Sequence, residues 1–289
     1  MAHNHKGRSA RIDARGKTNP PVCRAAVLRT VVSAIKPLKQ TLAAWEQGAT
    51  SFGRVDEWSD IDICVVAEDE GVESIFKAVE KALAKEYGIA SKFRLPEPTW
   101  HGSSQCFYVL KGASPFLFVD MAVMKRSRED RFLEYSIHGP PKVLFDKKGL
   151  VRDDSPRAAD FAKKIEGRIE YLKTTFGMFQ VEVLKELNRG NDIEALAFYN
   201  GMVLRPLVEA LRIKYCPWRY NFHTRYVYYD LPKPVVKRLH GFVYVADANA
   251  LKKKRAEAEK WFWQIINSID MREVRENLAR TAYKMPKKR

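Results

Sequence analysis

The run "SDIDICVV", residues 59–66, places two aspartates inside an apolar segment. Asp60 and Asp62 alternate with Ile61 and Ile63, which predicts a β-strand with both carboxylates on one face. Two adjacent carboxylates repel each other, and a half-buried strand gains nothing from them unless a cation or several strong donors lie between. The pair therefore indicates a cation site; the alternative is a solvated strand end or a helix N-cap.

A loop with two glycines precedes this strand. Gly48 lies twelve residues before Asp60, and Gly53 lies seven before it. Glycine lets the backbone approach a ligand closely, and a turn here can direct several N–H groups toward a phosphate. A phosphate neutralised by Mg²⁺ would explain the aspartates, because Mg²⁺ takes oxygen ligands from a few carboxylates and from substrate phosphates. The other groups that the loop offers to a phosphate are Thr50, Ser51, Arg54 and Ser59.

A third carboxylate is then expected from a neighbouring strand. Asp120, in "FLFVDMAVM", is an isolated aspartate inside a strongly apolar strand pattern. On its own it is equally well explained as a strand-edge residue that pairs with a basic side chain. Beside the glycine loop and the first two aspartates, we interpret it as a ligand of the same site.

Residues 48–63, "GATSFGRVDEWSDIDI", resemble the nucleotidyltransferase signature of the DNA polymerase beta superfamily, which reads Gly-Ser, a short loop with a second Gly, then Ser-Asp-x-Asp. The resemblance covers about residues 42–124 and extends to the group that includes the kanamycin and lincosamide nucleotidyltransferases. One position departs from the pattern: Ala49 stands where the family has Ser, so one side-chain donor to the triphosphate is missing. The positions that match are Gly48, Gly53, Ser59, Asp60, Asp62 and, as the third carboxylate, Asp120.

This resemblance implies Mg²⁺-dependent transfer of a nucleoside monophosphate from an NTP, most simply ATP, to a hydroxyl, with pyrophosphate as the leaving group. It implies two Mg²⁺ ions, held by the catalytic residues Asp60, Asp62 and Asp120. The tryptophans Trp45, Trp58 and Trp100 flank the motif and are candidates for stacking on a base, with packing as the alternative. The nucleotide-binding residues that it implies are Gly48, Ala49, Thr50, Ser51, Gly53, Arg54 and Ser59.

The acceptor is predicted to be a small molecule, such as an aminoglycoside-like compound, which suits the length and the two-part layout. An RNA 3′-end and a protein hydroxyl stay open as acceptors. So does a different class of protein, a catalytically silent relative that binds a nucleotide. Cationic acceptors would favour an acidic cleft, which a chain of net charge +16 does not indicate.

The order of the patterns predicts an α+β fold: a small mixed β-sheet domain with flanking helices, followed by an α-helical domain. In the helical half, the apolar period predicts one helix that ends at Gly190, and Asp230 is placed as the N-cap of a later one. The expected divisions are a basic flexible arm at 1–20, a nucleotidyltransferase catalytic domain at 21–150, a helical C-terminal domain at 151–283 and a basic tail at 284–289.

Composition adds expectations about the partners and the compartment. The arm holds five basic residues against one acidic residue, and the tail holds four basic residues, so half of the excess charge lies at the two ends. Basic ends favour polyanions such as RNA through counterion release, with solubility as the alternative role. The four cysteines show no CxxC spacing, which favours a reducing cytoplasm, and no apolar run is long enough to span a membrane.

Overall fold

The computed structural model describes residues 11–12, 18–19 and 22–284. The expected basic arm and basic tail therefore lie mostly outside the described residues. No helix in the described part is long and apolar enough to cross a membrane.

The chain divides into two compact units, Met1–Asp154 and Ser155–Arg289. The division falls a few residues after the expected boundary between residues 150 and 151. Each unit has its own core, so the two are described separately.

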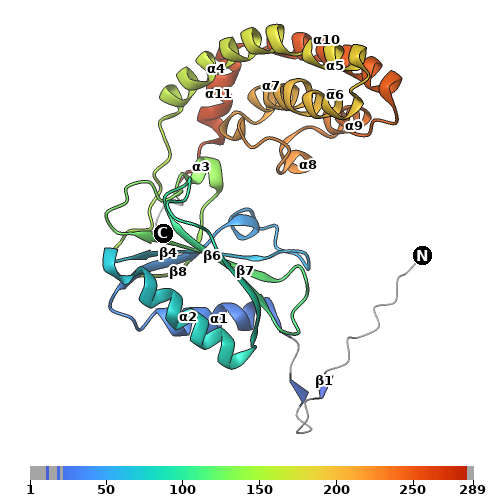
Figure 1. Cartoon of the computed structure of the whole chain (residues 1–289). Helices are drawn as coiled ribbons and strands as arrows, with labels where there is room; N and C mark the ends of the chain where they lie inside the picture. The colour runs from blue at the N-terminus through green and yellow to red at the C-terminus, as the bar shows by residue number, and fades with distance from the viewer. Residues whose placement is uncertain (1–10, 13–17, 20–21, 285–289) are drawn as a thin grey trace, which may run out of the picture. The chain divides into compact units, whose positions relative to one another are not determined.

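The strands of the first unit are β1 (Arg11–Ile12), β2 (Thr18–Asn19), β3 (Thr41–Glu46), β4 (Ile61–Ala67), β5 (Ile89–Arg94), β6 (Ser104–Leu110), β7 (Phe118–Lys125) and β8 (Lys142–Asp146). Six of them form one mixed sheet in the order β5-β6-β7-β4-β3-β8, and β1 pairs with β2 alone (Figure 1). Strands β4 and β7 run parallel, and the other neighbours in the sheet are antiparallel. The nearly continuous apolar sequence of β4 suits a central strand that is covered on both faces.

Helices α1 (Arg24–Ile35) and α2 (Val72–Glu86) pack against each other on one face of this sheet (Figure 1). Ile61 and the apolar residues that alternate after it along β4 join the core beneath these helices. Because side chains alternate along a strand, Asp62 and Cys64 point to the other face, where Cys64 belongs to a second, smaller core. Asp62 is half-buried at the start of that second face.

The second unit is helical, which confirms the predicted fold class. A π-helical turn, Tyr199–Leu204, interrupts the middle of the bundle. The core includes a stacked pair, Phe176 and Phe262, with ring centroids 3.7 Å apart. The helices are α4 (Ala158–Phe179), α5 (Glu182–Arg189), α6 (Asp192–Phe198), α7 (Arg205–Tyr215), α8 (Val227–Asp230), α9 (Lys233–Val243), α10 (Ala248–Asn267) and α11 (Met271–Thr281). A short helix of the first unit, α3 (Tyr135–His138), precedes β8.

Two expectations about the helical half are wrong. The helix expected to run to Gly190 breaks into α4 and α5 at Gln180 and Val181, although both residues keep right-handed helical dihedral angles. The helical spacing of apolar residues continues across this short break, so the sequence did not indicate that the helix is interrupted. Asp230 does not cap α9, which begins after Pro232, because two arginines bind its carboxylate instead.

These arginines make the second unit sensitive to acid. Arg212 Nη1 lies 2.9 Å from Asp230 Oδ2, and Arg219 Nη2 lies 2.8 Å from Oδ1. Burial alone would raise the pKa of the Asp230 carboxyl, but the hydrogen bonds from Arg219 and Arg212 hold that pKa below its ordinary value of 3.8. Arg212 is fully buried and also donates to the backbone oxygens of His223 and Arg225, so the pair anchors the loop between α7 and α8.

A carboxyl whose pKa is lowered by folding stabilises the protein above its unfolded-state pKa and loses that contribution as pH falls through the folded-state pKa. We therefore expect Asp230→Asn to lower the free energy of unfolding by about 3 kcal/mol at pH 7, since it leaves buried arginines uncompensated. The loss should shrink as pH falls below about 4, because the unfolded wild-type chain then binds a proton at Asp230 that the folded protein, with its lowered pKa, does not. Urea unfolding at pH 7, 5 and 3 measures this, with the exposed Glu276→Gln as control. A loss that stays the same at pH 3 would contradict the assignment.

Candidate active site

Asp62 and Asp120 lie directly opposite each other in the parallel ladder of β4 and β7. Adjacent strands are about 4.8 Å apart, so the two carboxylates leave neighbouring points of the same sheet face. Both residues are half-buried. The structure thus brings together two of the three aspartates that the sequence assigned to one site.

The backbone of the glycine loop lies against Asp62. Gly48 has a φ of +62°, and a Cβ atom built on it would lie 1.8 Å from Asp62 Oδ2. The backbone N–H of Gln47 donates to the backbone oxygen of Asp62 at 3.1 Å. Only glycine satisfies both the left-handed backbone and this close approach, so the first glycine of the motif is explained by the carboxylate that it touches.

Asp120 is oriented by a residue that the sequence analysis did not identify. Gln105 Nε2 donates a 2.6 Å hydrogen bond to Asp120 Oδ1. Gln105 is on β6, which pairs antiparallel with β7, and it follows Ser104 at the start of a strand whose remaining residues are apolar or aromatic. The sequence shows only a polar residue in a predicted strand. Its role as a partner of Asp120 becomes visible once β6 is known to lie beside β7.

A buried ion pair holds the other side of the loop, and sequence reasoning missed it as well. Arg24 Nη1 lies 2.5 Å from Glu46 Oε1, and Glu46 is fully buried at the end of β3. The same guanidinium donates to Thr50 Oγ1 at 3.1 Å and to the backbone oxygen of Asp60 at 3.2 Å. Arg24 thus ties the start of α1 to both the glycine loop and the entrance of β4.

We expect Arg24→Met to lower the free energy of unfolding by about 3 kcal/mol, because among the described residues Glu46 then keeps only Lys142, at 3.4 Å, as a cation. The double variant Arg24→Met/Glu46→Gln should recover part of this loss, since no unneutralised buried charge remains. Denaturant unfolding of the single and double variants gives the coupling energy between Arg24 and Glu46. The control is the exposed Arg29→Met on the same helix, which should change the free energy of unfolding by less than about 0.5 kcal/mol. Strict additivity of the two substitutions would show that the pair does not matter.

Two of the hydroxyl groups expected to bind phosphate, those of Thr50 and Ser59, are hydrogen-bonded to other side chains of the protein. Ser59 Oγ donates to Asp56 Oδ1 at 2.8 Å, and Thr50 Oγ1 donates to Glu46 Oε1 at 3.3 Å. Ser51 is buried, and its backbone oxygen would lie 2.7 Å from a Cβ at Gly139. The Thr50 and Ser59 side chains therefore shape the loop, whereas the buried Ser51 hydroxyl has no hydrogen-bond partner in the described part of the chain. Contact of any of the three with a nucleotide stays a prediction.

The remaining predicted residues complete the turn. Ala49 accepts hydrogen bonds at its backbone oxygen, including one of 2.9 Å from the Arg54 N–H. Gly53 has a φ of +62° and ends the short 3₁₀ helix Gly48–Phe52. Asp60 immediately precedes β4. No group of three or more His, Cys, Asp or Glu side chains in the described part of the chain is close enough to hold a metal ion.

The electrostatics of the second sheet face are negative near the aspartates. Burial raises the pKa of the Cys64 thiol above its ordinary value, and the charges of Asp62 and Asp120 raise it further, while Arg128 acts in the opposite direction. Cys64 Sγ donates to Gln47 Oε1 at 3.3 Å, beneath the loop. The site therefore favours a cation over an anion in direct contact with the carboxylates.

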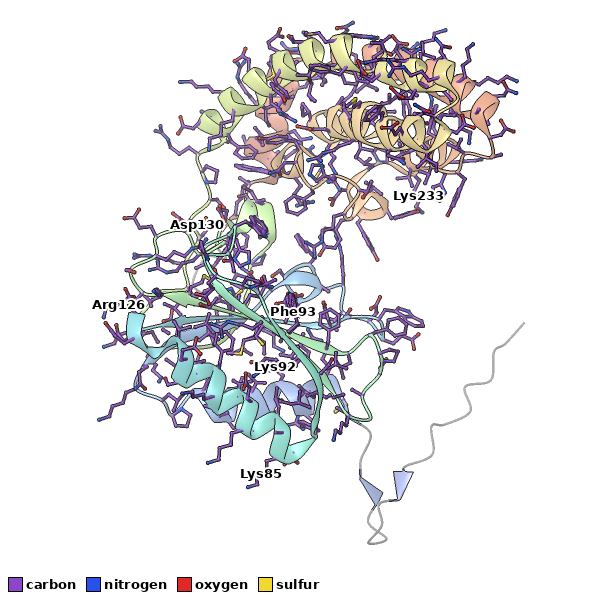
Figure 2. The ribbon with its side chains drawn as sticks, in the orientation of Figure 1. Lys85, Lys92, Phe93, Arg126, Asp130 and Lys233 are labelled. Carbon is purple, nitrogen blue, oxygen red and sulfur yellow. The ribbon has the colours of Figure 1, made fainter. Side chains whose placement is uncertain are left out.

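An aromatic row lies beside Asp120 on the same face. Phe107 is the cross-strand partner of Asp120, and Phe93 is the partner of Phe107 on the edge strand β5. The rings of Phe93 and Phe107 are stacked with centroids 6.3 Å apart, and Phe118 follows at 6.4 Å from Phe107. Figure 2 shows Phe93 on the side of the sheet away from α2, where Lys85 is labelled. Phe93 is 57% exposed, so the row offers a ring surface to a ligand.

The tryptophans divide between packing and exposure. Trp45 is fully buried in the second core, so stacking on a base is wrong for this residue. Trp58 is exposed and meets Phe116 edge-to-face at 4.8 Å, and Trp100 is almost wholly exposed. Trp45 is buried because β3 lies inside the sheet, between β4 and β8. The position of Trp45 near the motif in the sequence did not reveal this burial.

Comparison with solved structures finds similar chains at low identity. An aminoglycoside 6-adenyltransferase from Bacillus subtilis is 16% identical, with a TM-score of 0.34, over 89% of this chain and 91% of that one. A nucleotidyltransferase-like protein from Exiguobacterium sibiricum is 11% identical, with a TM-score of 0.35, over 84% and 74%. A STING-associated CdnE c-di-GMP synthase from Capnocytophaga granulosa is 14% identical, with a TM-score of 0.30, over 85% and 81%.

The first two names agree with the family that the motif resembles. No family model and no curated protein sequence matches the chain. Because all three TM-scores are 0.35 or lower, these likenesses do not bear on the activity of this chain.

Proposed function

We propose that this protein is an Mg²⁺-dependent nucleotidyltransferase that moves a nucleoside monophosphate from an NTP, with ATP as the first candidate, to a hydroxyl of a small molecule. The observation that carries the proposal is the direct pairing of Asp62 with Asp120, with the Gly48 backbone against one carboxylate. A structural role does not require two half-buried carboxylates side by side, since their repulsion destabilises the sheet.

The donor set suits Mg²⁺. Asp62 and Asp120 supply carboxylate oxygens, and Asp60 follows the loop immediately before β4. Mg²⁺ commonly binds one or two carboxylates and completes its coordination with water and substrate phosphates, so a three-carboxylate cluster need not exist before substrate arrives. When bound, the ions would neutralise phosphate charge and lower the pKa of the acceptor hydroxyl. Two ions are proposed, held by Asp60, Asp62 and Asp120.

The chain's own residues have separate tasks in this reaction. The loop Gly48–Phe52, with Gly53, Arg54 and Ser59, is proposed to position the triphosphate. Gln105 holds the Asp120 carboxylate in one orientation at 2.6 Å. The acceptor oxygen bonds to the α-phosphorus, the bond from that phosphorus to the bridging oxygen of the β-phosphate breaks, and pyrophosphate leaves. The hydroxyl proton passes to the Asp120 carboxylate, which is the proposed base.

The aromatic row bears on the acceptor. Phe93 and Phe107 present stacked rings beside Asp120, and Phe118 is tilted against Phe107. This row favours an acceptor with a flat or apolar face next to its hydroxyl. A small molecule with a ring meets this condition. Single-stranded RNA also does, because its bases stack on exposed aromatic side chains, so an RNA 3′-hydroxyl is the second candidate.

Label transfer from α-³²P-labelled ATP, GTP, CTP and UTP with Mg²⁺ tests the proposal. Aminoglycosides, aromatic alcohols, short RNA and a cell lysate serve as acceptors, and Asp60→Asn/Asp62→Asn is compared with wild type. A labelled product that is absent from the variant establishes the reaction, and its size identifies the acceptor class. ATP binding without transfer to any acceptor would instead support a silent nucleotide-binding protein.

A further inference from the structure

A cavity of about 260 Å³ opens within the second unit, whereas the residues discussed above as the active site all belong to the first unit. It lies among α4, the π-helical turn and α7. Its walls are mainly aromatic and aliphatic, with two arginines and one glutamate among them. The residues that carry the argument are Tyr171, Phe179, Gly201, Arg168, Arg205 and Glu209.

The π-helical turn helps to form this space. Gly201 lies within Tyr199–Leu204, and a Cβ built on it would meet no atom within 4 Å. Single π-helical turns within α-helices are often found at functional sites, because the extra residue widens the helix and displaces side chains. The open wall at Gly201 is thus a local property of this turn and of the missing side chain.

One end of the cavity holds a neutralised ion pair. Glu209 is 2% exposed, and Arg168 donates to both of its carboxylate oxygens, at 2.5 and 2.9 Å. The Arg168 guanidinium also lies 4.4 Å from the centre of the Tyr171 ring. Because Arg168 satisfies Glu209, this carboxylate is not a strong binding point for a cationic ligand.

Arg205 adds a positive charge that this pair does not cancel. Its Nη2 lies 3.0 Å from His223 Nε2. Burial lowers the pKa of the His223 imidazole, and the charge of Arg205 lowers it further, so the ring is neutral at pH 7. The cavity lining therefore contains two guanidinium groups and one carboxylate, a net charge of +1.

We propose that this cavity is a binding site for a small organic monoanion with one aromatic ring, the ring lying among the aromatic walls and the anionic group at Arg205. The inference does not depend on the proposed transferase activity. The volume is close to the lower limit of roughly 300 Å³ for small-molecule pockets, which suits a single ring. An aromatic wall supplies the apolar contact, and a planar guanidinium can bind a carboxylate through two hydrogen bonds.

Binding of phenylacetate and phenethylamine, measured by ligand-observed NMR and calorimetry on the full chain, tests this site. The two probes share a ring and differ in the sign of their charge. We expect saturable binding of phenylacetate at millimolar concentration and at least about tenfold weaker binding of phenethylamine, a difference of 1.4 kcal/mol. No saturable phenylacetate binding up to about 10 mM, or equal binding of both probes, would overturn the proposal.

Two pairs of variants make the test specific to the cavity. Gly201→Leu should fill the space and abolish phenylacetate binding, whereas Gly241→Leu, at a helical glycine in α9 that also meets no atom within 4 Å, should retain it. Arg205→Gln should weaken phenylacetate binding about tenfold, and the exposed Arg275→Gln on α11 should not. Circular dichroism confirms that each variant is folded. Binding that survives Gly201→Leu would place the ligand elsewhere and overturn the assignment.

Discussion

Asp62→Asn is expected to lower the rate of nucleotidyl transfer about a thousandfold while the protein stays folded. The carboxylate faces Asp120 across the parallel ladder. The proposed metal ions would lower the activation free energy by several kcal/mol by stabilising charge in the transition state, and each 1.4 kcal/mol changes the rate about tenfold. Without Mg²⁺ the variant should be at least as stable as wild type, because it removes a repulsion between neighbouring carboxylates. Label transfer measures the rate, and thermal unfolding with and without Mg²⁺ and ATP measures the stability.

The melting temperatures with and without Mg²⁺ and ATP show whether Asp62 acts by holding a metal ion. Mg²⁺ with ATP should raise the melting temperature of wild type and have little effect on Asp62→Asn. The exposed Glu70→Gln, which removes one carboxylate from the surface of the same unit, should behave as wild type in both assays. An Asp62→Asn protein that keeps its transfer rate would remove Asp62 from the chemistry.

Gly48→Ala is expected to reduce the transfer rate about a hundredfold, the usual effect of moving a reacting group by about 1 Å. The new Cβ would lie 1.8 Å from Asp62 Oδ2, so either the carboxylate or the loop must move. The left-handed backbone at φ +62° adds about 1–2 kcal/mol of strain for any residue with a Cβ. Transfer kinetics and denaturant unfolding of the same preparation measure the two effects.

Gly53→Ala distinguishes the effect of the steric contact with Asp62 from the effect of backbone strain. Gly53 has the same φ of +62°, but a Cβ there meets no atom within 4 Å. Its loss of stability should therefore come from backbone strain alone, and its loss of activity should be clearly smaller than that of Gly48→Ala. Equal losses of activity in the two variants would mean that the contact with Asp62 is unimportant.

The sequence revealed the parts of the site that are local. Asp60 and Asp62 lie two residues apart, and Gly48 and Gly53 lie in one short loop, so residue type and spacing were enough to propose a common site. Asp120 was found as a carboxylate in an apolar strand, but its position opposite Asp62 depends on the parallel register of β4 and β7. That register follows from the crossover through α2, β5 and β6, which no short motif encodes.

The supporting contacts were hidden for a related reason. Arg24 and Glu46 are ordinary surface types in the sequence, and only the closeness of α1 to the end of β3 turns them into a buried pair. Asp230 was assigned to a helix start because local rules favour it there, whereas Arg212, far earlier in the chain, supplies a stronger partner. Ion pairs between residues distant in the sequence override local capping preferences where burial of an unpaired charge would strongly destabilise the fold.

The parallel pairing of β4 with β7 also governs when the proposed active site is assembled during folding. All of α2, β5 and β6 must be synthesised before Asp120 exists, and the sheet must then close a long crossover to bring it to Asp62. Closing such non-local contacts is a slow step of folding. A chain still emerging from the ribosome, or one cut before β7, therefore holds half of the acidic pair, and the proposed metal site is complete only in a finished first unit.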